Sequence, residues 1–149
     1  VSPKGIDGTF AILSPKQVTF LNLTGSGNET AAHILKNNRI TIMFCAFKHP
    51  PLILRLYGKA VAIHKNDAQW AELIKNFANV AGARQIFVID IEDIISSCGY
   101  AVPEMEIVKQ REILVDWAQQ KGEDGIKDYW NKKNQKSIDG FPTNILPSE

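Results

Sequence analysis

Residues 23–30 combine the residue types and the spacing that could bind a phosphate group. The run reads Leu-Thr-Gly-Ser-Gly-Asn-Glu-Thr and leads directly into an Ala-rich stretch. A strand that passes into a helix at such a point gathers free backbone N–H groups, small hydroxyls and the positive end of a helix dipole. These groups suit a phosphate. An ordinary strand-to-helix turn with a helix cap would use the same residues, so both interpretations stay open at this point.

The same run lacks the general nucleotide-binding signatures. It is neither GxGxxG nor a P-loop, because no lysine follows Gly27. His33 lies one helical turn further on, and we interpret it as a packing residue. Cys45 is expected to be an inert buried thiol, and Cys98 has no adjacent base that would activate it. The sequence therefore identifies no catalytic residue.

Neither the histidines and cysteines nor the carboxylates form a pattern that predicts a metal site. No spacing of His and Cys is typical of structural zinc. Asp90, Glu92 and Asp93 follow an apolar run and are interpreted as solvated or capping carboxylates. We therefore predict no metal.

Composition limits the class of protein. A chain of 149 residues is expected to form a single domain over 1–149. Its formal net charge of +1 gives no reason to expect nucleic acid or a membrane surface as a partner. Two distant cysteines, no 18-residue apolar run and no signal peptide favour a reduced, cytoplasmic protein. The chain opens on Val1 without a methionine, which we interpret as a fragment or as the ordered part of a longer chain.

Periodicity predicts the elements that must position the phosphate-binding run. Strands are expected over residues 10–13, 17–23, 39–47, 52–64 and 83–91, and helices over 28–35, 66–77, 106–121 and 123–134. An extended tail follows over 137–149. Residues 39–47 are apolar on both faces, which predicts burial between layers or at a subunit interface. Gly58 is placed where a barrel strand often bends. Segregated elements favour an α+β fold with a mainly antiparallel sheet that could close as a small barrel.

Five blocks, taken together and in order, resemble a known family. They are VSPKG at residues 1–5, LTGSGNETAAH at 23–33, TIMFCAF at 41–47, RLYG at 55–58 and SCGYAVP at 97–103. The set is similar to the pyridoxamine 5′-phosphate oxidase-like flavoproteins, in an uncharacterised branch, and the similarity covers nearly the whole chain. The resemblance implies a split β-barrel with peripheral helices and two C-terminal helices. It also implies a homodimer that holds FMN at its subunit interface.

The resemblance assigns roles to particular residues. The FMN phosphate would be held by the run after the strand, namely Thr24, Gly25, Ser26, Gly27, Asn28, Glu29 and Thr30. The flavin ring would lie along Ser2, Pro3, Lys4 and Gly5, where it needs backbone donors and a cation. Better-known relatives carry Arg and Lys at the start of the helix, whereas this chain has Asn28 and Glu29. Lys4 or Arg55 could supply the missing positive charge, and Glu29 would repel a phosphate unless it accepts an N–H or pairs with a base.

Two functions remain open at this stage. The first is an FMN-dependent oxidoreductase of unknown small-molecule substrate, and the alternative is a non-catalytic flavin carrier or sensor. Deazaflavin in place of FMN is a third option. Family members usually have a helix and a strand before the VSPKG block, so we expect that these are missing from this chain.

Overall fold

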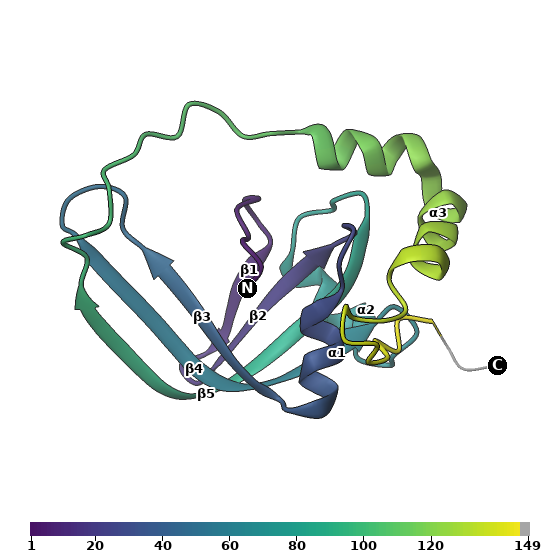
Figure 1. The fold of residues 1–149 in the computed structure, drawn as a ribbon, viewed down its shortest axis with the longest axis horizontal. Helices are drawn as coiled ribbons and strands as arrows, with labels where there is room; N and C mark the ends of the chain where they lie inside the picture. Colours follow the sequence, from purple (N-terminus) through teal and green to yellow (C-terminus); the bar gives the residue numbers. More distant parts are fainter. Residues whose placement is uncertain (147–149) are drawn as a thin grey trace.

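The computed structural model describes residues 1–146 and consists of one curved antiparallel sheet with helices around it (Figure 1). Its elements are β1 (Phe10–Ser14), β2 (Gln17–Leu23), α1 (Glu29–Lys36), β3 (Arg39–Cys45), β4 (Leu52–His64), α2 (Trp70–Leu73), the 3₁₀ turn η1 (Ile74–Asn76), β5 (Ala83–Cys98) and α3 (Ile113–Lys133). Every strand pair is antiparallel. The predicted α+β class is therefore confirmed.

The sheet curls until its two edge strands approach each other. The strand order is β1-β2-β5-β4-β3, so β1 and β3 are the edges. Phe10 of β1 and Phe44 of β3 meet edge to face, with ring centroids 5.4 Å apart. No hydrogen-bonded pairing joins these two strands within residues 1–146. The sheet is thus a barrel that is split between β1 and β3.

Gly58 lies at a bend in β4. The pairing register with β5 shifts between Tyr57 and Gly58, which is a β-bulge. A Cβ atom at residue 58 would overlap the backbone carbonyl oxygen of Asp90 on β5. Only glycine allows β4 and β5 to approach this closely, which confirms the predicted bend.

Helix α1 packs one of its faces against the sheet. Its Ala31 and Ile34 join a core with side chains from β2, β4 and β5, and Ala31 is fully buried. The small side chains of Ala31 and Ala32 let the helix approach the sheet closely. Because the helix is fixed by this core, the loop before it is also fixed at one end.

Four elements differ from the sequence prediction. The strand predicted over 39–47 ends at Cys45, and the helix predicted over 66–77 is reduced to α2 and η1. β5 continues to Cys98 instead of ending at 91, because β4 offers a hydrogen-bonding partner as far as Leu52. The helix predicted over 106–121 begins only at Ile113. Ile107 and Val108 are 82% and 93% exposed, so no packing surface stabilises a helix there.

The two cysteines are both free, as expected. Cys98 is exposed at the end of β5. Cys45 is only partly buried at the end of β3, so the expectation of a buried thiol holds only in part.

The predicted division of the C-terminal helical region is confirmed. Gly122 has φ 64° and ψ 176°, so it separates α3 into two parts. In the second part, Ile126 and Trp130 form a small core with Ala118 and Ile145. Residues 137–146 of the predicted tail fold back on this core, with Thr143 and Ile145 buried. Residues 147–149 lie outside the described part of the chain.

Candidate functional site

A cavity of about 600 Å³ lies between the N-terminal segment and the loop before α1. Its walls come from the first six residues, from β2, from the start of α1 and from single residues of β5 and α3. Those residues are Val1, Ser2, Pro3, Lys4, Gly5, Ile6, Thr9, Leu21, Asn22, Leu23, Thr24, Gly25, Gly27, Asn28, Glu29, Thr30, His33, Arg84, Leu114 and Ile138. The cavity is therefore lined by elements that are far apart in the sequence.

Ten of the twelve residues that the sequence assigned to the cofactor line this cavity. Ser26 and Arg55 are the two that do not. Ser26 is exposed at the tip of the loop. Arg55 lies on β4, where its Nη1 donates to the Ser97 hydroxyl at 3.0 Å. Of the two residues that were expected to supply a cation, Lys4 lines the cavity and Arg55 does not.

The backbone carbonyls of the loop are hydrogen-bonded to protein groups. Asn134 Nδ2 donates to the carbonyls of Gly25 and Ser26, at 2.9 and 3.4 Å. Arg84 Nη1 also donates to the Gly25 carbonyl, at 3.3 Å. At the start of the loop, Thr24 donates its hydroxyl to the Gly82 carbonyl at 2.8 Å. The conformation of this glycine-rich segment is thus determined from outside it.

The side chain of Asn28 does not cap α1. It makes no hydrogen bond to the first-turn amides, although it occupies the N-cap position. Instead, its Oδ1 accepts from Gln85 Nε2 at 2.5 Å, and its Nδ2 donates to the Asn134 carbonyl at 3.2 Å. A helix whose N-cap side chain is used elsewhere leaves its first-turn N–H groups for another acceptor, and an anion suits that role.

Arg84 is a candidate binding residue that the sequence analysis did not identify. It is 4% exposed and lines the cavity, and its buried Nε has no hydrogen-bond partner. No carboxylate among residues 1–146 forms an ion pair with it. Burial lowers the pKa of Arg84 to about 10. A buried guanidinium without a counter-charge is a strong candidate for an anion-binding group.

Lys4 brings a second cation to the cavity. Its Nζ donates to Asn22 Oδ1 at 2.7 Å and to the Ser2 hydroxyl at 2.8 Å. Desolvation and, to a smaller extent, the charge of Arg84 lower the pKa of Lys4. Because the charge of Arg84 disfavours the charged form of Lys4, an anion bound near both would relieve this repulsion.

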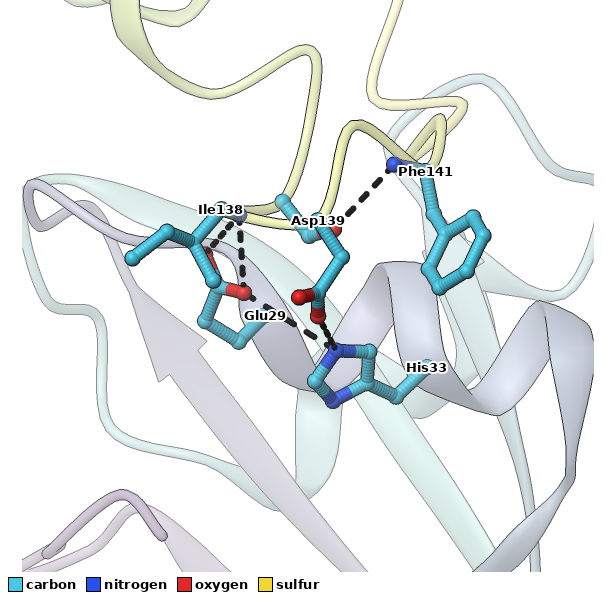
Figure 2. A network of polar contacts seen from close by, with 6 residues as sticks. Glu29, His33, Ile138, Asp139 and Phe141 are labelled. Carbon is cyan, nitrogen blue, oxygen red and sulfur yellow. Dashed lines mark hydrogen bonds and ion pairs between the residues drawn. The ribbon is translucent and has the colours of Figure 1, made fainter.

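Glu29 is held by the C-terminal part of the chain (Figure 2). Both of its carboxylate oxygens lie 3.1 Å from the backbone N–H of Ile138, which donates to them. His33 Nε2 lies 3.9 Å from Glu29 and 3.3 Å from Asp139. Glu29 therefore has both kinds of partner that would offset its repulsion of a phosphate, an N–H donor and a neighbouring base.

Glu29, His33 and Asp139 also place their ligand atoms within 4.8 Å of one another. No local pattern could have predicted this group, because 106 residues separate His33 from Asp139. All three side chains are at least 41% exposed, and Glu29 already accepts a hydrogen bond. We interpret the group as a contact between α1 and the C-terminal segment.

Together these features define a split-barrel protein with a cavity beside its first helix that is lined by two cationic side chains, Lys4 and Arg84. A family model described as pyridoxamine 5′-phosphate oxidase matches residues 2–98. The chain belongs to the pyridoxamine 5′-phosphate oxidase family, and the resemblance found in the sequence is confirmed.

One curated relative is a pyridoxamine 5′-phosphate oxidase family protein, ustO, of Aspergillus flavus. It is 34% identical over 160 residues, which cover 95% of this chain and 64% of the relative. The chain thus spans slightly less than two thirds of the length of that relative.

Two solved structures of HupZ from Group A Streptococcus show a weaker likeness. The structure of a HupZ point variant has a TM-score of 0.48 and 18% identity, covering 60% of this chain and 73% of HupZ. The other HupZ structure has a TM-score of 0.47 and 16% identity, covering 66% and 74%. Among the described residues, no helix is both long and apolar enough to cross a membrane.

Proposed function

We propose that this chain binds FMN in the cavity beside α1 and serves as a flavin-dependent oxidoreductase. The observation that carries the proposal is Arg84, a buried guanidinium without a counter-charge that lines a cavity of about 600 Å³. Membership in the pyridoxamine 5′-phosphate oxidase family supports a flavin as the ligand. A phosphate-bearing flavin would provide the negative charge that Arg84 and Lys4 lack.

The residues of the cavity fit the parts of FMN. Arg84, the loop over residues 24–28 and the free first-turn amides of α1 would hold the phosphate. The segment from Ser2 to Gly5 would lie along the flavin ring, and Lys4 would place a cation near it. When bound, FMN supplies hydride or electron transfer. The chain's own part is to bind and orient the cofactor and to shield it on the barrel side.

Comparison of FMN with riboflavin tests this proposal. Riboflavin lacks the phosphate, so we expect protein freed of ligand to bind it at least about tenfold more weakly than FMN, as loss of a charged hydrogen bond implies. Titration calorimetry measures both affinities. Equal affinities would contradict a phosphate site in this cavity.

The redox behaviour of the complex then separates the enzyme from the carrier. Loss of the visible flavin absorbance on addition of NADH or NADPH, with turnover in air, supports an oxidoreductase. Bleaching by dithionite alone supports a carrier or sensor. If the protein binds a deazaflavin more tightly than FMN, the proposed binding site stands but the proposed cofactor is wrong.

We further propose that the chain is a homodimer with the cofactor at its interface. Met43 of β3 and Ile95 of β5 flank Arg55 on the same face of the sheet, and both are exposed. Phe44 and Ile94 on the other face are also more than a third exposed. Exposed apolar side chains of this kind are typical of obligate interfaces.

The dimer is tested by sedimentation equilibrium at micromolar concentration. We expect a dimer for the unchanged chain and a shift toward monomer for Ile95→Glu, because the interface would bury a carboxylate without a partner. Leu35→Glu on α1 is the matched control, since Leu35 is exposed but lies outside this face. A monomeric unchanged chain would exclude a cofactor shared between subunits.

A further inference from the structure

The loop that carries the anion-binding groups is held by residues more than 100 positions further along the chain. Trp130 Nε1 donates to the Thr24 hydroxyl at 2.8 Å. Asn134 donates to the carbonyls of Gly25 and Ser26. Ile138 contacts Glu29 at the start of α1, and Asp139 contacts His33 one turn further along the helix (Figure 2). We name Trp130, Asn134, Ile138 and Asp139 the C-terminal clasp.

Asn134 is the central residue of the clasp. It is fully buried, and its own carbonyl accepts hydrogen bonds from Asn28 Nδ2 at 3.2 Å and from the Thr143 hydroxyl at 2.6 Å. Its side-chain Oδ1 is buried without a hydrogen-bond partner. An unpaired buried oxygen is unfavourable for folding, so Oδ1 does not explain why an asparagine occupies this position. The two hydrogen bonds that Nδ2 donates to the loop do explain it.

Those donors determine the direction of the loop's N–H groups. In a trans peptide the C=O and the N–H of the same unit point in opposite directions. The Gly25 carbonyl belongs to the unit that carries the Ser26 N–H, and the Ser26 carbonyl to the unit that carries the Gly27 N–H. When Asn134 holds both carbonyls, both N–H groups are directed away from Asn134. A loop with two glycines would otherwise sample many orientations.

We infer that Asn134 is a positioning residue of the anion site, which holds the Gly25–Gly27 backbone ready for a phosphate. The inference rests on the proposed function in taking that phosphate to be the one on FMN. The residues of the clasp all lie beyond residue 98, where the match to the family model ends. The residues that would position the phosphate loop therefore lie outside the region that the family model matches.

The test compares the ratio of FMN affinity to riboflavin affinity in variants of the full chain. Asn134→Ala is expected to lower FMN affinity about tenfold and to leave riboflavin affinity within about twofold, since only FMN contacts the loop through a phosphate. Thr143→Val is the matched control. It removes a hydrogen bond from the backbone carbonyl of Asn134 but leaves both bonds to the loop. The control should keep the FMN to riboflavin ratio even if its melting temperature falls.

The outcomes separate this inference from the proposed function. A lower melting temperature with an unchanged ratio in Asn134→Ala would overturn the positioning role and leave FMN binding intact. A ratio near one in the unchanged chain would overturn FMN-phosphate binding, and the positioning role with it. If Asn134→Ala does not fold, Asn134→Leu takes its place, because leucine keeps a branched side chain in the buried position but offers no donor to the Gly25 and Ser26 carbonyls. An unchanged ratio in that variant would likewise overturn the inference.

Discussion

Replacing Arg84 with methionine should weaken FMN binding by roughly 30-fold to 1,000-fold, which corresponds to the loss of one partner of a buried charge pair. Arg84 is the buried cation of the cavity, and its Nε has no partner within residues 1–146. Methionine keeps much of the side-chain volume and removes the charge. Titration calorimetry with FMN measures the loss directly.

The same substitution should stabilise the ligand-free protein by roughly 1–3 kcal/mol, because a buried charge without a counter-charge is replaced by an apolar group. Burial lowers the pKa of Arg84 to about 10 in the folded chain, below its value in the unfolded chain. Below pH 10 both the folded and the unfolded chain hold the proton, so the full destabilisation is present at neutral pH. Above about pH 10 the folded chain loses this proton before the unfolded chain does, so the contribution of Arg84 to the free energy of unfolding rises with pH.

Arg39→Met is the matched control for this prediction. Arg39 begins β3, is exposed and lies outside the cavity. The control should bind FMN as the unchanged chain does and should show no gain in stability. A ligand-free Arg84→Met protein that is less stable than the unchanged chain would show that Arg84 is a structural residue.

Gly58→Ala should destabilise the fold by roughly 3 kcal/mol or more, at the upper end of the range for overpacking. The added Cβ would overlap the Asp90 carbonyl on β5 and come within 3.1 Å of an Ile89 side-chain carbon. The Asp90 oxygen belongs to a backbone that is paired on both sides, with β2 and with β4, so it cannot move alone. Urea unfolding followed by circular dichroism measures the loss.

Gly125→Ala is the matched control and should have the opposite sign. Gly125 lies in the second part of α3, where an added Cβ would meet Lys121 carbons at an ordinary 3.4 Å. Alanine favours a helix over glycine, so a gain of about 0.5–1 kcal/mol is expected. Similar losses in both variants would mean that the bulge at Gly58 does not depend on glycine.

The sequence was most informative where local pattern and tertiary packing agree. β2 and β4 have the predicted bounds, because their apolar alternation faces both the barrel core and α2. Ile107 and Val108 follow a helical pattern, but nothing packs against them, and the helix begins later. The end of β5 is a strand because β4 lies beside it, which no local pattern of Ser96 and Ser97 expresses.

The residues of the candidate site also fall into those that the sequence could predict and those that it could not. The loop over residues 24–30 could be predicted, because its glycines, hydroxyls and helix start are adjacent in the sequence. Arg84 and Asn134 could not, because their roles depend on contacts made 59 and 109 residues away, at Gly25. A single arginine before an apolar strand and a single asparagine after a helix are ordinary in any sequence.

The separation between Gly25 and Asn134 also has a consequence for synthesis. A ribosome makes the loop, the barrel strands and Arg84 before it makes Asn134, so the nascent chain presents the loop without its restraint. Products that stop before residue 134 would retain every strand of the sheet. They would lack Asn134, the residue that we infer to orient the loop amides. If the loop binds FMN as we propose, firm binding of the phosphate therefore has to wait until residue 134 has been made.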